Sequence, residues 1–260
     1  RVHPPSKDDG TRRESTNMGK SDILFVFPPG PGYVGAFRNH LGAAYLRAAL
    51  AREGMATAQY LNAHPGTIDA VAADIVRRKS PIVGFTVYDS NARLSIAMAQ
   101  SIKRQQPAVQ VVFGGPEATF NAQPLMEKHA VIDICVLGEA EETAAQVFAK
   151  LLGGGDFDET QPGVAFRRDG QVVCTSLPPL VGSGQPGVDG VLDSTPSPYL
   201  SGVLTDGQEG VLTGRGCTHH CQYCCFAALA RKRLRLHSID RGVAELAYIA
   251  EHQKRKGRRL

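Results

Sequence analysis

The 260-residue sequence has no long uninterrupted apolar run and no recognisable secretory signal. A membrane-spanning helix needs about 20 predominantly apolar residues, so we expect no membrane span. Without a signal, and in a chain that is not small, the six cysteines are not expected to form a disulfide framework. They indicate a reducing compartment, and we expect a cytoplasmic protein.

The sequence also lacks a strong overall charge, because 29 Lys and Arg stand against 25 Asp and Glu. Ten of those basic residues lie within residues 231–260. That stretch has the pattern of an amphipathic helix, whose charged side is usually solvated. We therefore expect no nucleic-acid partner.

Residues 1–20 are polar and without apolar periodicity, which predicts a disordered tail. From residue 21 to 153, apolar strands alternate five times with helical segments. Strands are predicted at 21–27, 56–61, 81–88, 109–113 and 132–137, and helices at 39–52, 67–79, 91–105, 124–128 and 138–152. This alternation predicts an α/β fold, a flavodoxin-like doubly wound parallel sheet with helices on both faces. Its ligand should bind at the carboxyl ends of the strands.

Residues 154–208 are predicted to be a hairpin followed by a linker. The hairpin turn is Asp169-Gly170, between two apolar runs, and residues 176–208 are rich in Pro, Gly, Ser and Asp. A second domain is expected over 209–260, beginning with a strand at Gly210–Thr213. It continues into a helix capped by Ser238 that carries Ile239, Val243, Leu246 and Ala250 on one face.

Three cysteines, Cys217, Cys221 and Cys224, stand at C-x3-C-x2-C spacing directly after Gly214-Arg215-Gly216. The spacing places three thiolates on one short loop. Soft thiolate ligands select iron–sulfur clusters, zinc or copper(I). A [4Fe–4S] cluster held by only three cysteines keeps one iron free to bind a substrate or cofactor.

A structural zinc site is the alternative, because Cys225, His219 or His220 could supply a fourth ligand. Zinc sites usually pair two C-x2-C knuckles that are well separated in sequence. Here all the candidate ligands lie within residues 217–225, so an iron–sulfur cluster is the preferred interpretation.

With Tyr223 as the aromatic residue before the last cysteine, the motif resembles that of the radical S-adenosylmethionine (SAM) enzymes. The resemblance implies that Cys217, Cys221 and Cys224 hold a [4Fe–4S] cluster, with SAM on the open iron and Tyr223 near its adenine. One electron, from a donor such as flavodoxin or ferredoxin, would then cleave SAM to a 5′-deoxyadenosyl radical. It also implies that residues 209–260 begin a partial (β/α) barrel.

A flavodoxin-like domain directly before such a motif resembles the cobalamin (B12)-binding half of B12-dependent radical SAM enzymes. The strings Val136–Thr143 and Pro196–Leu200 are similar to that family's domain ending and linker. The resemblance implies six cobalamin contacts at the strand ends, namely Thr86, Tyr88, Gly114, Gly115, Gly138 and Glu139. Glu139 and Glu141 have a second interpretation, as first-turn residues that complement a helix dipole.

One departure from many B12 domains concerns the Asp-x-His-x-x-Gly motif, whose histidine ligates cobalt from below. The loop after the first strand, 28–33, has no histidine before His40, and His64 lacks the pattern. Either cobalt has no histidine ligand or the domain has lost B12, and we favour retained B12.

The family resemblance implies a methyltransferase that uses methylcobalamin and the deoxyadenosyl radical on an unactivated carbon of a small molecule or peptide. A B12-dependent ring-forming or rearranging enzyme is the alternative within the class, and a non-catalytic corrinoid- or metal-binding module the alternative outside it. Too few residues follow Cys224 to close a barrel, so we expect a fragment of a longer protein.

Overall fold

The computed structural model describes most of the chain, namely residues 21–30, 37–62, 65–182, 192–204, 210–219, 221–231 and 233–255. The tail at 1–20 and the histidines at 64 and 220 lie outside these ranges. Among the described residues, no helix combines the length and the apolar character needed to cross a bilayer.

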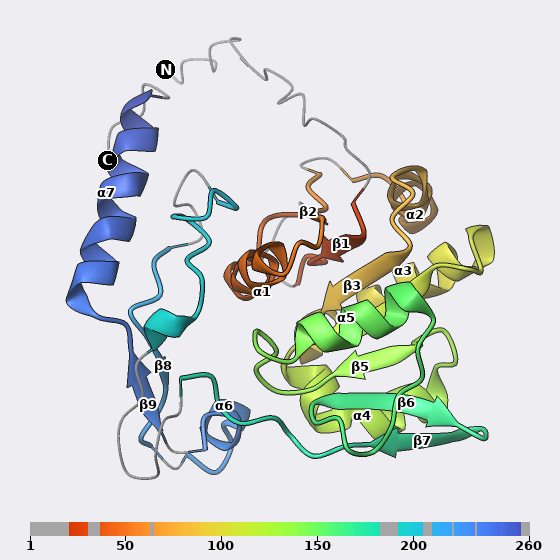
Figure 1. The fold of residues 1–260 in the computed structure, drawn as a ribbon. Coiled ribbons are helices and arrows are strands. Elements are labelled where there is room, and N and C mark those ends of the chain that lie inside the picture. The colour runs from red at the N-terminus through yellow and green to blue at the C-terminus, as the bar shows by residue number, and fades with distance from the viewer. Residues whose placement is uncertain are drawn as a thin grey trace, which may run out of the picture.

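A seven-stranded sheet of order β2-β1-β3-β4-β5-β6-β7 forms the first domain (Figure 1). Its strands are β1 Ile23–Val26, β2 Thr57–Gln59, β3 Ile82–Thr86, β4 Gln110–Gly114, β5 Ile134–Val136, β6 Val164–Arg168 and β7 Gln171–Cys174. The first five are parallel, which confirms the predicted doubly wound sheet.

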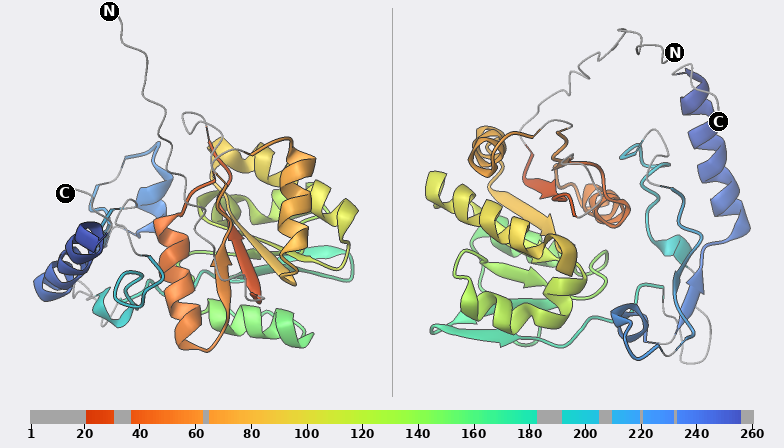
Figure 2. Two further views of the ribbon diagram at one scale, coloured as in Figure 1. Left: turned by 90° about the horizontal axis from the view of Figure 1, so that it is seen from above. Right: turned by 180° about the vertical axis from the view of Figure 1, so that it is seen from behind.

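Helices cover both faces of this sheet (Figures 1 and 2). They are α1 Leu41–Arg52, α2 Ile68–Arg77, α3 Ala92–Gln105, α4 Pro116–Lys128 and α5 Ala144–Gly153. Alternate residues of β1 fill opposite cores, with Leu24 and Val26 in one apolar cluster and Ile23 and Phe25 in the other. The period of two explains why each predicted strand is apolar along its whole length.

Helix α4 is longer than the predicted segment at 124–128, because it starts at Pro116 and has a kink at Asn121 before the internal Pro124. Proline removes a helical hydrogen bond, so the sequence around it favours a helix start there. The chain instead forms one turn before the kink.

The predicted hairpin is confirmed, and its turn residues Asp169 and Gly170 both have positive φ, of 51° and 78°. The hairpin does not lie in a linker outside the sheet, however. Strand β6 pairs antiparallel with β5 through Cys135 and Ala165, so the sheet extends beyond the predicted domain boundary at residue 153.

The C-terminal elements stand beside α1 (Figures 1 and 2). They are the 3-10 turn η2 Leu192–Ser194, strand β8 Gly214–Gly216, helix α6 Cys225–Leu229, strand β9 Leu234–Leu236 and helix α7 Ile239–Arg255. The prediction of a strand at Gly210–Thr213 is wrong, because the strand that forms, β8, begins at Gly214. Only residues 214–216 find an antiparallel partner, which is β9.

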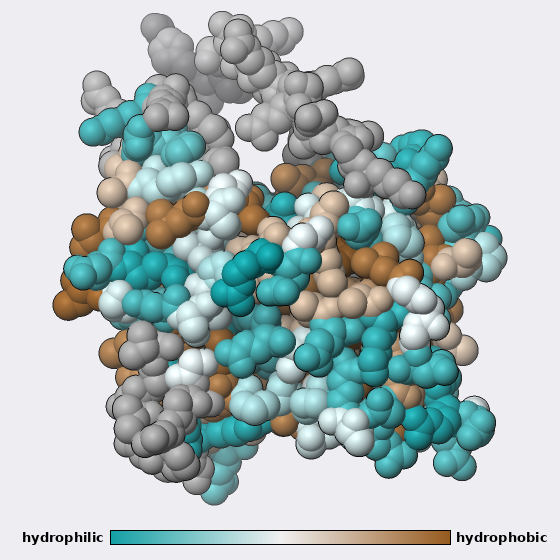
Figure 3. Space-filling view, in the orientation of Figure 1, coloured by the Kyte–Doolittle hydropathy of each residue, from teal (hydrophilic) through white to brown (hydrophobic). Residues whose placement is uncertain are grey.

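Helix α7 is capped as predicted, since the Ser238 hydroxyl accepts the Arg241 N–H at 3.2 Å. Its expected apolar face is exposed, however, with Ile239 at 84% and Val243 at 59%, and Figure 3 shows hydrophobic residues at that edge of the molecule. The helix turns its other side inward and buries Glu245 and Ile249.

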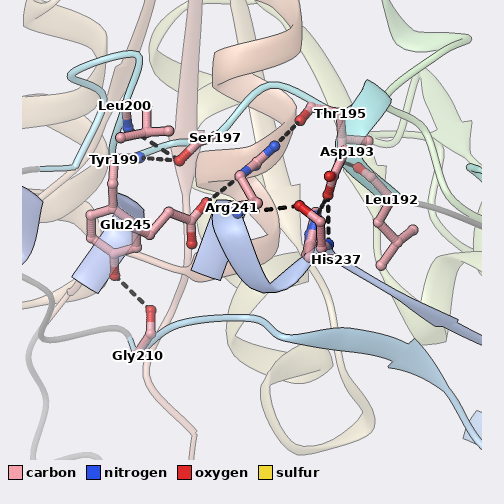
Figure 4. A network of polar contacts seen from close by, with 11 residues as sticks. Leu192, Asp193, Thr195, Ser197, Tyr199, Leu200, Gly210, His237, Arg241 and Glu245 are labelled. Atoms are coloured by element: carbon pink, nitrogen blue, oxygen red, sulfur yellow. Dashed lines mark hydrogen bonds and ion pairs between the residues drawn. The ribbon is translucent and has the colours of Figure 1, made fainter. Parts of the chain in front are cut away.

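A polar network fixes α7 in this orientation (Figure 4). Glu245 binds the Arg241 guanidinium at 2.8 Å, and Arg241 also donates to the Thr195 carbonyl at 2.9 Å. Asp193 accepts from the Ser238 N–H at 3.0 Å. The contacts tie α7 to the linker, and an apolar cluster that includes Ala44, Tyr199, Leu204 and Ile249 ties both to α1.

His40 caps the first helix, because its Nδ1 accepts the Ala43 N–H at 3.3 Å. Burial lowers the pKa of His40 to about 4. The folded protein therefore holds this imidazole neutral.

The low pKa of His40 predicts an acid-sensitive fold. The unfolded chain binds a proton at His40 below about pH 6.5, whereas the folded chain does so only near pH 4. The group therefore removes about 2 kcal/mol of stability between pH 7 and pH 5. His40→Asn keeps a capping side chain, and its denaturant unfolding should show a pH dependence that is weaker by this amount. Equal pH dependence in both proteins would contradict the assignment.

A second prediction concerns Gly115, which has a φ of 96° and whose Cβ would lie 2.8 Å from the Val87 carbonyl oxygen. We expect Gly115→Ala to destabilise the chain by about 1–3 kcal/mol in urea unfolding. Gly153→Ala is the matched control, because an added Cβ there meets nothing within 4 Å. The same urea midpoint for both variants would contradict this prediction, because it would show that the backbone around residue 115 accommodates the added Cβ.

Candidate functional site

The carboxyl edge of the parallel sheet gathers most of the predicted corrinoid contacts. Thr86 is the last residue of β3, and Tyr88 follows it by two. Gly114 ends β4, Gly115 caps α4, and Gly138 follows β5. Parallel strands bring these ends together at one edge, as the sequence predicts.

An uncharged aromatic group lies at this edge. The Tyr88 side chain is 37% exposed, and its hydroxyl is 3.1 Å from His40 Nε2. Since Nδ1 of the neutral His40 is an acceptor, Nε2 carries the proton and donates to Tyr88. Phe27 packs against both rings, with centroids 4.6 Å from His40 and 6.2 Å from Tyr88.

Asn91 joins the loops after β1 and β3. Its Nδ2 donates to the carbonyls of Pro28 and Thr86, each at 3.1 Å, and its Oδ1 accepts the Tyr88 N–H at 2.9 Å. The sequence predicts Asn91 only as a helix start. A buried asparagine satisfied on three sides fixes the backbone on which Tyr88 stands.

Contacts within the protein explain why glycine stands at two of the predicted positions. Gly115 needs its positive φ and lies against the Val87 backbone. Gly138 has a φ of 72°, and a Cβ there would lie 3.0 Å from Pro178 of the linker. At Gly114 a Cβ would meet only ordinary contacts, the nearest 3.8 Å away.

Glu139 contacts the C-terminal part of the chain. Its carboxylate binds the Arg235 guanidinium at 2.6 and 2.7 Å and accepts the Val181 N–H at 2.8 Å. Glu141 pairs with Arg215 at 2.5 Å. Neither interpretation offered by the sequence, a corrin contact or a helix-dipole partner, includes these arginines.

The three predicted cluster ligands lie on one loop between β8 and α6. Gly216, just before Cys217, has a φ of 110°, and a Cβ there would overlap the Arg233 carbonyl oxygen at 1.7 Å. Only glycine permits the two strands to approach so closely. At the other end, the Cys224 N–H donates to the Cys221 carbonyl at 3.1 Å, and Cys224 caps α6.

All three thiols are free; Cys217 and Cys224 are half-buried, and Cys221 is exposed. Over the described residues, no three Cys, His, Asp or Glu side chains lie close enough to share a metal ion. The structure thus places the cysteines on one loop without converging their thiols. The donor set of three reduced, accessible thiols fits an iron–sulfur cluster.

The other residues of the loop are placed as follows. Tyr223 is 92% exposed beside Cys224. Cys225 is exposed at the start of α6, and His219 is exposed as well. Neither of the two forms a metal-binding group with the other described side chains.

Four residues of this region were not predicted: His40, Asn91, Arg215 and Arg235. His40 and Asn91 stand at helix starts, where a cap is common and gives no hint of a tertiary contact. The alternation Arg233-Leu234-Arg235-Leu236 is a strand signal, but it predicts the leucines on the inward face and therefore gives no hint that Arg235 is buried.

Comparisons with known proteins agree with this arrangement. Residues 34–148 match the B12 binding domain family. The chain is 28% identical over 238 residues to an uncharacterised methyltransferase of Pyrococcus horikoshii, covering 87% of the chain and 50% of that protein. It is 25% identical to cytidylyl-2-hydroxyethylphosphonate methyltransferase of Streptomyces wedmorensis, covering 85% of the chain and 48% of that protein. The chain thus spans about half the length of these relatives.

A shorter match, of 126 residues at 31% identity, is to the anaerobic magnesium-protoporphyrin IX monomethyl ester cyclase of Synechocystis sp.. It covers 47% of the chain and 24% of that protein.

Among solved structures, the fold is similar to that of the cobalamin-dependent S-adenosylmethionine radical enzyme OxsB with aqua-cobalamin and S-adenosylmethionine bound. The TM-score is 0.67 at 17% identity, covering 92% of this chain and 32% of OxsB. Residues 34–148 therefore match the B12 binding domain family, the chain is a relative of proteins named as methyltransferases, and its fold is similar to that of a cobalamin-dependent radical SAM enzyme.

Proposed function

We propose that the chain is the corrinoid- and cluster-binding part of a B12-dependent radical SAM methyltransferase that acts on an unactivated carbon. One observation carries the proposal. A domain of the B12-binding family and a C-x3-C-x2-C loop occur in one chain, and the hairpin that bears the loop is docked on that domain through Glu139 and Glu141.

The carboxyl edge of the sheet is the proposed corrinoid site. Thr86, Gly114, Gly115 and Gly138 border it, and Tyr88 presents an uncharged ring to it, suited to a flat and largely apolar macrocycle. A bound cobalamin would supply a carrier for the methyl group.

His40 is the described histidine at this edge, and both of its ring nitrogens are already engaged, by Ala43 and by Tyr88. We therefore propose that His40 holds Tyr88 in place and does not ligate cobalt. The cobalt would then have no histidine ligand from the described part of the chain.

The cysteine loop is the proposed cluster site. Cys217, Cys221 and Cys224 would supply three thiolates to a [4Fe–4S] cluster, and the exposed Tyr223 would lie beside SAM on the fourth iron. A bound cluster would supply the electron that cleaves SAM. Because a cluster of this kind is oxygen-sensitive and needs an electron, we also propose a reducing cytoplasmic location and a flavodoxin- or ferredoxin-like electron donor.

Methyl transfer is preferred to ring formation because of the extent of the matches. The methyltransferase relatives align with 85–87% of the chain, including the cysteine loop region, whereas the cyclase aligns with 47%. The substrate, a small molecule or peptide, is left open by these matches.

Anaerobic reconstitution tests the cluster site. With iron and sulfide, the wild-type chain should take up about four irons and show the broad visible absorbance of a [4Fe–4S] cluster. Replacing Cys217, Cys221 or Cys224 by serine should remove most of both signals. Cys225→Ser is the matched control, since that thiol is exposed on the neighbouring residue. Zinc bound in place of iron, with Cys225 required, would sink the proposal in favour of a structural zinc site.

Titration with hydroxocobalamin tests the corrinoid site. We expect Tyr88→Ala to weaken binding about tenfold, because its exposed aromatic ring offers apolar surface at this edge. Leu152→Ala is the control, since Leu152 is 40% exposed near the end of α5. After reduction to the cob(II) form, the electron paramagnetic resonance spectrum should lack histidine nitrogen coupling. Such coupling, lost in a His40→Asn variant, would contradict the role given to His40.

A further inference from the structure

The two strands that flank the cysteine loop carry arginines directly opposite each other. Arg215 on β8 and Arg235 on β9 are paired in the antiparallel register. Like charges in this position repel each other. Both are also withdrawn from water, with side chains 13% and 1% exposed. Leaving either guanidinium without a carboxylate would therefore strongly destabilise this hairpin.

Both carboxylates come from the first domain. Glu139 and Glu141, two residues apart just after β5, meet the two arginines one to one. Arg235 binds Glu139 with both terminal nitrogens, at 2.6 and 2.7 Å, while Nη2 of Arg215 lies 2.5 Å from Glu141. The bidentate geometry sets direction as well as distance.

Further contacts join the same two parts of the chain. The Arg235 Nη1 also donates to the Val181 carbonyl at 2.6 Å, and Arg231 donates to the Pro178 carbonyl at 2.8 Å. The Arg215 guanidinium lies 5.0 Å from the centre of the Tyr45 ring on α1. The hairpin is therefore attached to the linker, to α1 and to the loop after β5.

The pKa values of Glu139 and Arg215 are shifted toward their charged forms. Burial acts to raise the pKa of Glu139, but its hydrogen bonds with Arg235 hold that pKa below the usual value. Burial likewise acts to lower the pKa of Arg215, and the Glu141 carboxylate more than offsets it.

We propose that the pairs Glu139–Arg235 and Glu141–Arg215 form an interdomain latch that positions the cysteine loop relative to the carboxyl edge of the sheet. Arg215 is separated from Cys217 only by Gly216, whose backbone is pressed against Arg233. A displacement of either pair is thereby passed to the loop. Glu139 is then a positioning residue and not a corrinoid contact. The positioning role rests on the proposed function, whereas the existence of the latch rests on the two ion pairs alone.

Hydrogen exchange of the cofactor-free chain tests the existence of the latch. Glu141→Gln and Glu139→Gln each leave a buried arginine without its partner. Exchange at Gly214–Gly216 and Leu234–Leu236 should become about tenfold faster or more, with β3 and β4 unchanged. Glu142→Gln, at the exposed neighbouring residue, should match the wild type. Hairpin exchange equal to wild type in both latch variants would overturn the proposal.

A double variant, Glu141→Gln with Arg215→Gln, guards against a failure to fold, because no buried charge is left unpaired. Its hairpin exchange should fall between wild type and Glu141→Gln. If the two substitutions changed hairpin exchange additively, with no coupling between them, Glu141 and Arg215 would not act as a pair.

A test of the positioning role needs a measurement that does not change when only the stability of the contact between the hairpin and the first domain changes. In the intact enzyme loaded with cob(II)alamin and reduced cluster, pulsed electron paramagnetic resonance measures the separation of the two centres. Glu141→Gln should broaden or shift this distance distribution while both centres remain loaded, and Glu142→Gln should not. An unchanged distribution in Glu141→Gln would overturn the positioning role. A wild-type enzyme that loads neither centre would refute the proposed function instead, and hydrogen exchange would still decide whether the latch exists.

Discussion

Two buried arginines opposite each other on a short hairpin are the constraint on which the arrangement of this molecule depends. Strands β8 and β9 have only three residues each. Isolated two-stranded hairpins of this size are marginal in water. Here Glu139 and Glu141 neutralise the arginines, and the hairpin becomes an extension of the first domain. Because the cysteines lie in the connection between β8 and β9, the position of the loop depends on the contacts of the hairpin with the first domain.

The sheet contributes a rigid reference for this geometry. Strand β5 is buried on both faces, and its end leads through Gly138 directly to Glu139. The same edge carries Tyr88, which is fixed by His40 and by the buried Asn91. One parallel sheet thus sets the position of both the proposed corrinoid face and the latch, as is usual for sites built at the carboxyl ends of strands.

Much of this fold could be predicted from the sequence. The five parallel strands and the Asp169-Gly170 turn follow from apolar periodicity and turn chemistry, which are local signals. The ladder between β5 and β6 could not be predicted, because pairing of a hairpin with a sheet edge depends on which edge is left open. The side of α7 that packs inward could not be predicted for a similar reason. Its apolar residues Ile239 and Val243 follow the helical period, but the contacts of Glu245 and Arg241 decide which side faces inward.

The candidate site divides in the same way. The cluster cysteines and the strand-end glycines are visible as motifs, whereas the partner of Glu139 lies 96 positions further along the chain. No local pattern links a glutamate after one strand to an arginine on another, so the latch required the structure.

We propose that this one chain brings a corrinoid and an iron–sulfur cluster together. Native mass spectrometry of the anaerobically reconstituted chain measures it directly. We predict a species that carries one cobalamin and one four-iron, four-sulfide cluster at the same time. A chain that binds zinc at the cysteine loop, or that never binds both groups together, would contradict it.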